Sequence, residues 1–224
     1  MIFKDQYDKS IPQKSVFSTS VLVTTLVSFY TVFADFGLLN FGTIISRDNL
    51  RLGLMVICIL IYLIRLMITT WVYQKRKWTW QETIIISIVM SLAMSAFISV
   101  GGANTKGVGI VEVFGVVLYL FGSYINTRAE YSRHIWKLNP ANKGKLYTVG
   151  LFRYAMHINY FGDVVLFVGL AMLTHFTLLV IPAFMYFNFV FNIIPSFDRY
   201  LEMKYTEQFM TYTREAKKLI PWIY

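Results

Sequence analysis

Long apolar runs alternate with short polar segments along the whole chain. A helix that crosses a membrane needs about 20 apolar residues, because each residue adds about 1.5 Å against a hydrocarbon core about 30 Å thick. Six runs have roughly this length, and they predict an all-α integral membrane protein in which about six transmembrane helices form one bundle. The predicted spans are residues 16–40, 50–74, 82–100, 107–126, 157–174 and 176–195.

The segments between the runs predict how the helices are connected. Only "THF" separates the last two runs, which predicts a tight helical hairpin. The longest polar segment, 127–156, is predicted to be a loop, and an amphipathic tail follows Pro195. Because no low-complexity linker interrupts the chain, residues 1–224 are predicted to form a single membrane domain.

The composition supports this class of protein. The chain is 56% hydrophobic and only 15% charged, whereas a soluble domain carries about a quarter charged residues. The first fourteen residues are polar and lack the apolar core of a signal peptide. The single cysteine, Cys58, excludes an internal disulfide and a cysteine-based metal cluster. His134 and His175 have no partners at ligand spacing, so no metal site is predicted.

The distribution of positive charge predicts the topology. Most of the 21 Lys and Arg residues lie in the N-terminal segment, after the second run, within 127–156, and in the tail. The opposite side has only Arg47, Arg51 and Lys106, and Arg65 lies inside the second run. Cytosolic loops carry the excess of Lys and Arg, so both termini are predicted to be cytosolic. Anionic membrane lipids and cofactor phosphates explain the net charge of +9 better than nucleic acid does.

Three ionisable residues fall inside the predicted spans or at their mouths. Arg65, Glu112 and Asp163 would each cost about 2.5–3.5 kcal/mol at mid-bilayer if charged. Such residues usually face a protein interior or a wet cavity, and they often mark function. A structural alternative is a buried pair that fixes helix packing, either Arg65 with Glu112 or Arg65 with Asp163.

Residues three or four apart share one face of a helix, and three helices each offer such a polar pair near the predicted cytosolic half. This convergence favours a functional site over scattered structural polar residues. The pairs are Tyr62 with Arg65, Asn126 with Glu130, and Asn159 with Asp163.

The segment "NTRAEYSRHIWKLNPANKGKLYTVGLFRYAMHINYFGD" resembles the C-terminal domain of the steroid 5-alpha-reductase family. That family is related to the sterol reductases and, more distantly, to the isoprenylcysteine carboxyl methyltransferases. Its pattern is N-x-x-x-D, a basic stretch, G-L-[FW]-x-x-x-R-H-P-N-Y-x-G-[ED], and a tail ending near I-P-[FWY]-[IL]-[FY]. The resemblance covers residues 122–224. The matching residues are Asn126 with Glu130, Gly150 to Phe152, His157, Asn159, Tyr160, Gly162, Asp163 and Ile220 to Tyr224.

The sequence departs from the family pattern at a few positions. Met156 stands where the family has Arg, Ile158 replaces Pro, and Glu130 replaces Asp. The final acid is Asp163, as in the sterol reductases.

The resemblance implies a membrane-embedded reductase that transfers hydride from NADPH to a C=C bond of a steroid, sterol or other lipid. The stretch "IYLIR" resembles the reductase segment in which a catalytic Tyr stands three residues before an Arg. Tyr62 and Asp163 would then be the catalytic pair that stabilises negative charge on the substrate oxygen.

The resemblance also implies an NADPH site on the cytosolic side, where Arg or Lys would bind the 2′-phosphate. The positive-inside rule alone also accounts for the cations among these residues. The predicted cofactor-binding residues are Arg65, Asn126, Arg128, Glu130, Arg133, Lys137, Lys145, Arg153, His157, Asn159, Tyr160, Arg199 and Tyr200.

Two other functions stay open. An S-adenosylmethionine-dependent methyltransferase of lipids or prenylated cysteine would usually have paired acids after the last span, whereas Asp198 and Glu202 are separate here. A catalytically inactive membrane relative would explain Met156 and Ile158. If the source is eukaryotic, the endoplasmic reticulum is the expected membrane.

Overall fold

The computed structural model describes residues 7–33 and 48–224, and all the regular elements in these two ranges are helices. The chain divides into two compact units. The N-terminal unit comprises Gln6–Tyr119 and Val168–Ile181, and the C-terminal unit contains Leu120–Phe167 and Pro182–Tyr224. The predicted cations Lys4 and Arg47 lie outside the described residues.

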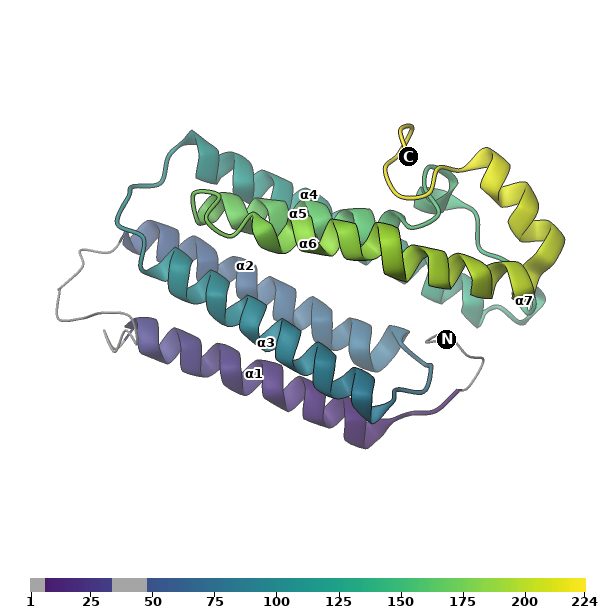
Figure 1. Ribbon diagram of the computed structural model, residues 1–224, viewed down its shortest axis with the longest axis horizontal. Coiled ribbons are helices and arrows are strands. Elements are labelled where there is room, and N and C mark those ends of the chain that lie inside the picture. The colour runs from purple at the N-terminus through teal and green to yellow at the C-terminus, as the bar shows by residue number, and fades with distance from the viewer. Residues whose placement is uncertain (1–6, 34–47) are drawn as a thin grey trace. The chain divides into compact units, whose positions relative to one another are not determined.

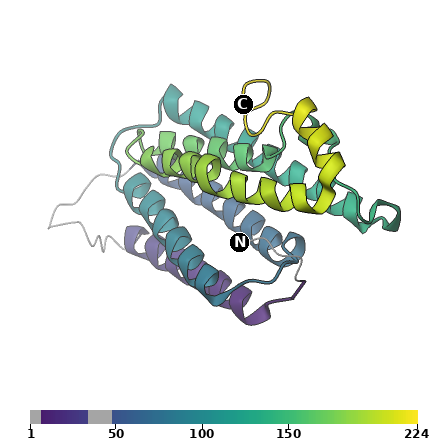
Figure 2. The ribbon, with the colours of Figure 1, turned by 45° about the vertical axis from the view of Figure 1, so that its right-hand side comes forward.

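Three helices of the N-terminal unit lie side by side in both ribbon views (Figures 1 and 2). They are α1 (Ile11–Phe33), α2 (Asn49–Ile68) and α3 (Trp80–Gly102), and α3 contacts both of the others. The last turn of α2 widens into a π-helix, η1 (Thr69–Tyr73). Side chains fix where the helices begin, because the Thr79 hydroxyl accepts a hydrogen bond from the Glu82 N–H at the start of α3.

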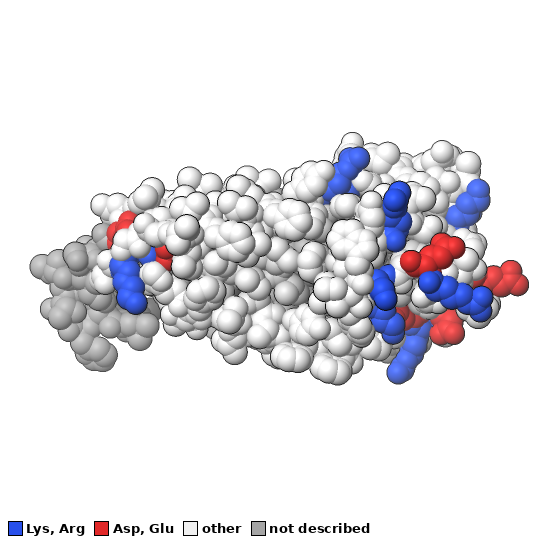
Figure 3. Space-filling view, turned by 90° about the horizontal axis from the view of Figure 1, so that it is seen from above, with Lys and Arg blue, Asp and Glu red and all other residues white. Residues whose placement is uncertain are grey.

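Within residues 7–33 and 48–224, five helices are long and apolar enough to cross a membrane, which is compatible with a multi-pass membrane protein. The fifth predicted span, 157–174, is also helical, but its helix α5 (Ile158–Leu173) has only 16 residues. Large apolar side chains are exposed along these helices, and Figure 3 shows broad stretches of surface without charged side chains. The five helices are Ile11–Phe33, Asn49–Tyr73, Trp80–Gly102, Ile110–Leu138 and Val180–Glu215.

Helix α4 (Ile110–Leu138) extends well beyond its predicted end at residue 126. The prediction of a loop from 127 was therefore wrong for its first twelve residues, and the loop begins only after Leu138. Residues 127–138 are too polar to extend an apolar run, but they include good helix formers such as Ala129, Glu130 and Arg133. Two short 3₁₀ turns follow, η2 (Pro140–Asn142) and η3 (Gly150–Arg153).

The amphipathic tail predicted after Pro195 is helical as far as Glu215 and is continuous with the last predicted span. Helix α6 (Val180–Asn188) passes through the π-helix η4 (Phe189–Ile193) into α7 (Ile194–Glu215), so the predicted tail continues as a helix. Pro195 lies in the first turn of α7, directly after the π-helix. A proline ring clashes with the carbonyl four residues earlier in a regular α-helix, and the wider π turn at that place relieves the clash.

Candidate functional site

A polar cluster joins α4 to α5 inside the C-terminal unit. The Asn126 side-chain amide donates to the Asn159 carbonyl at 2.9 Å, and the Asn159 side-chain amide donates to Glu130 Oε1 at 2.9 Å. All three residues are buried. Buried polar groups of this kind are stable because they satisfy one another's hydrogen bonds.

Arg133 completes this cluster from one helical turn further along α4. Its Nη2 donates to both carboxylate oxygens of Glu130, at 2.7 and 2.6 Å. The guanidinium also lies over the Phe152 ring, 5.4 Å from its centre. We call Asn126, Glu130, Arg133 and Asn159 the carboxylate–amide cluster. Because Arg133 is engaged with Glu130, its role in this structure is to hold the carboxylate in place.

A buried histidine just before α5 is paired with a half-buried aspartate of α7. His157 Nε2 is 2.8 Å from Asp198 Oδ1, and the His157 side chain is 1% exposed. The main chain there is also anchored, because the Met156 and His157 N–H groups donate to the carbonyls of Lys217 and Lys218. Asp198 was not among the predicted cofactor-binding residues. The sequence did offer a sign of its role, because Asp198 directly precedes Arg199, which was in that set.

Aromatic rings surround this pair. The rings of His157 and Phe189 both lie nearly parallel to the Tyr160 ring, with centres 5.7 and 4.7 Å away. Phe197 stacks on Tyr200 at 5.9 Å and lies at an angle to His157. The π-helix η4 supplies Phe189 and α7 supplies Phe197, so the widened turn before Pro195 helps to shape this aromatic group.

The other predicted cofactor residues of this unit are exposed, apart from Tyr200, which is half-buried. Arg153 lies over Tyr154 at 4.9 Å, and the Tyr200 hydroxyl accepts a hydrogen bond from Lys204. The structure therefore separates the predicted set into a buried group that is already hydrogen-bonded and exposed cations that are accessible to an anion. The exposed cations are Arg128, Lys137, Lys145, Arg153 and Arg199.

Tyr62 and Arg65 lie on α2, in the N-terminal unit. The Arg65 guanidinium is 5.3 Å from the centre of the Tyr62 ring, so the two share a helix face, as their spacing predicts. Asp163 is half-buried on α5, in the part of that helix that belongs to the C-terminal unit. The pairing of Tyr62 with Asp163 stays a prediction.

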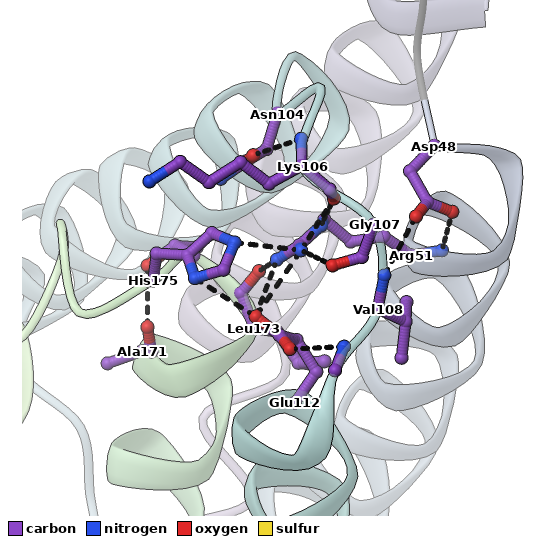
Figure 4. Close-up of polar contacts among 12 residues, drawn as sticks. Asp48, Arg51, Asn104, Lys106, Gly107, Val108, Glu112, Ala171, Leu173 and His175 are labelled. Atoms are coloured by element: carbon purple, nitrogen blue, oxygen red, sulfur yellow. Dashed lines mark hydrogen bonds and ion pairs between the residues drawn. The ribbon is translucent and has the colours of Figure 1, made fainter.

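A second buried cluster, in the N-terminal unit, is centred on Arg51 (Figure 4). Arg51 and Glu112 form an ion pair at 3.3 Å, with their side chains 0% and 1% exposed. The guanidinium also donates to the carbonyls of Lys106, Gly107 and Leu173. The helix start, the α3–α4 loop and the turn after α5 are thereby fastened together. The sequence offered a signal for this pair, because the predicted spans 50–74 and 107–126 each carry one charged residue close to their start, Arg51 and Glu112.

The structural alternative in which Arg65 pairs with Glu112 is not observed, because Glu112 pairs with Arg51. Arg65 lies fourteen residues further along α2, which is about 21 Å at 1.5 Å per residue. An arginine side chain does not span that distance.

His175 completes the Arg51 cluster. Its Nδ1 is 3.1 Å from Glu112, and its Nε2 is 3.0 Å from Arg51. The His175 and Phe176 N–H groups donate back to the carbonyls of Met172 and Ala171, which is the Schellman arrangement that ends a helix. His175 takes the left-handed conformation, with φ 50°, where glycine is the usual residue. Its two side-chain contacts offset the cost of that conformation.

Asp48 caps the start of α2 and also contacts the α3–α4 loop. Its carboxylate accepts hydrogen bonds from the N–H groups of Arg51, Leu50 and Val108. These hydrogen bonds hold the pKa of Asp48 below its ordinary value, and the bond from the Arg51 N–H has the largest effect. The contribution to stability is therefore complete above the unfolded pKa of about 3.9 and is lost as the pH falls through the lower, folded pKa.

We expect Asp48→Asn to lower the melting temperature at neutral pH. An amide has only one oxygen, so the Val108 N–H loses the Oδ2 acceptor that the carboxylate provides. The difference from the wild-type protein should shrink below about pH 4, where protonation weakens the wild-type carboxylate as well. Thermal unfolding of both proteins in detergent between pH 3 and 7 tests this. A difference that is constant over the whole range would contradict the assignment.

Comparison with known proteins gives two matches. The family described as "Protein of unknown function (DUF1295)" matches residues 62–216, a range that contains every predicted site residue. The "Probable O-methyltransferase ustE" of Ustilaginoidea virens is 29% identical over 121 residues, which are 53% of this chain and 42% of that protein. The chain thus spans less than half the length of that relative. No solved structure matches.

Proposed function

The chain belongs to the DUF1295 family of proteins of unknown function, and from the polar groups of its C-terminal unit we propose that it is a membrane-embedded, NADPH-dependent reductase of a lipid C=C bond. The observation that carries this proposal is the carboxylate–amide cluster, which shares its unit with a set of exposed cations. Steroids, sterols and other lipids are the proposed substrates, and the endoplasmic reticulum is the proposed membrane if the source is eukaryotic.

The chemistry of these side chains fits a nucleotide with several phosphates. A carboxylate such as Glu130 can accept hydrogen bonds from ribose hydroxyls, and the amides of Asn126 and Asn159 can donate or accept. Exposed arginines and lysines suit phosphates, including the 2′-phosphate that distinguishes NADPH from NADH. When bound, NADPH supplies the hydride. The proposed phosphate ligands are Arg128, Lys137, Lys145, Arg153 and Arg199.

The chain's own residues have distinct tasks in this proposal. Asn159 and Arg133 hold the Glu130 carboxylate in one orientation before any ligand arrives. Ligand binding therefore loses no conformational entropy of this side chain. This gives Arg133 a positioning role rather than a phosphate contact. We further propose, from the resemblance to the reductases, that Tyr62 and Asp163 stabilise the negative charge that develops on the substrate.

An S-adenosylmethionine-dependent O-methyltransferase is the second candidate, because the relative from Ustilaginoidea virens bears that description. S-adenosylmethionine has no phosphate group, so it would leave the exposed cations without a ligand. Those cations support the reductase for this reason. A catalytically inactive relative would bind neither cofactor.

We expect Glu130→Gln to weaken NADPH binding about tenfold, because a carboxylate makes stronger hydrogen bonds than an amide. The measurement is a fluorescence titration of the detergent-purified protein with NADPH, NADH and S-adenosylmethionine in separate experiments. Glu207→Gln is the matched control, since it removes the same charge from an exposed position on α7.

The three titrations also separate the candidate functions. Tight binding of NADPH that Glu130→Gln weakens and Glu207→Gln does not would support the reductase. Preference for S-adenosylmethionine would move the protein to the second candidate. Binding of none of the three would leave the inactive relative.

A further inference from the structure

We propose that Asp198 is a positioning residue of the nucleotide site, which fixes the tautomer and orientation of His157. This inference rests on the proposed function and adds a residue that the family resemblance did not supply. Asp198 comes from α7, 41 residues after His157, and its Oδ1 lies 2.8 Å from His157 Nε2.

The chemistry of the pair determines which nitrogen carries the proton. An ionised carboxylate only accepts hydrogen bonds, so the neutral His157 ring must carry its hydrogen on Nε2, where it donates to Asp198. Nδ1 is then the acceptor of the ring. The pair therefore presents one defined acceptor to a donor group of a ligand, such as an amide or a hydroxyl.

The surroundings of His157 restrict the ring in the same way. Tyr160 lies parallel to it, 5.7 Å away, and Phe197 lies at an angle on the neighbouring helix. The main chain is held by the bond from the His157 N–H to the Lys218 carbonyl. With the backbone anchored and the ring packed, the Asp198 carboxylate decides which tautomer is favoured.

A surface ion pair does not account for Asp198. Lys218 is 3.8 Å from Asp198 Oδ2, and its side chain is 51% exposed. Exposed pairs at this distance contribute little. The closer contact is with a histidine that is almost fully buried and lies within the segment predicted to bind the cofactor. Glu202, one helical turn further along α7, is exposed and gives a matched control.

The test combines binding with a direct reading of the tautomer. Detergent-purified protein labelled with ¹⁵N-histidine is compared for wild type, Asp198→Asn and Glu202→Gln, and the His157 signals are identified from the His157→Gln variant. In the wild type we expect the Nε2–H tautomer. In Asp198→Asn we expect mixed tautomers and about tenfold weaker binding of NADPH, with a melting temperature close to the wild-type value. Glu202→Gln should match the wild type in both measurements.

The outcomes are distinguishable. If the wild type binds NADPH and Asp198→Asn binds it equally well, the inference is overturned and the proposed function stands. If the wild type binds no NADPH, the proposed function fails and this inference fails with it. Should Asp198→Asn not fold, the wild-type spectrum and Asp198→Glu decide: an Nδ1–H tautomer in the wild type overturns the inference, and the Nε2–H tautomer with binding by Asp198→Glu supports it.

Discussion

Replacing Arg51 with methionine is expected to lower the free energy of unfolding by about 3–5 kcal/mol, the usual range when one partner of a buried ion pair is removed. Glu112 would keep its contacts with the Gly109 N–H and with His175, but its charge would have lost the guanidinium. The carbonyls of Lys106, Gly107 and Leu173 would lose their donor at the same time. Thermal or denaturant unfolding in detergent measures the effect.

Lys106→Met is the matched control for Arg51→Met. Lys106 is an exposed cation of the same loop, and only its main-chain carbonyl takes part in the Arg51 cluster. We expect its replacement to change stability by less than about 0.5 kcal/mol. The double variant Arg51→Met with Glu112→Met should recover part of the loss, because no unpaired charge then stays buried. Similar stability for Arg51→Met and Lys106→Met would show that the side-chain contacts of Arg51 do not stabilise the fold.

Hydropathy located the helices well, because the length of an apolar run is set by the thickness of the bilayer. It placed helix ends poorly wherever a helix leaves the apolar region. Residues 127–138 of α4 and the polar part of α7 are helical although their hydropathy is low. Helix formation there depends on propensity and on local pairs such as Glu130 with Arg133, and not on contact with lipid.

The spacing of residues along the chain predicts contacts only within one helix. It predicted that Tyr62 and Arg65 share a face, because three residues are nearly one helical turn. It could not supply the partner of Glu112, which is 61 residues away, or that of His157, which is 41 residues away. Those partners are determined by how the helices pack. The resemblance to a family could not supply them either, because it identifies only the residues of the family motif.

Substituting alanine for Gly122 is expected to have the other large effect. A Cβ added there would lie 2.5 Å from the Gly162 carbonyl oxygen and from the Leu166 nitrogen. Both are backbone atoms of α5, so no side chain can rotate away, and α4 and α5 would have to separate. Overpacking of this kind costs about 1–3 kcal/mol, and we expect the upper end here. Gly53→Ala is the control.

Gly53 is also in a helix, but a Cβ there would meet nothing within 4 Å, so alanine should be neutral or stabilising by up to about 1 kcal/mol. The two glycine substitutions should also differ in their effect on cofactor binding. A Cβ on Gly162 would lie 2.8 Å from the Asn126 nitrogen, so the same close approach brings Asn126 within reach of the Asn159 carbonyl. Gly122→Ala should therefore weaken NADPH binding as well as stability, whereas Gly53→Ala should change neither for the worse. Unchanged melting temperature and binding in Gly122→Ala would mean that helix contact does not position the carboxylate–amide cluster.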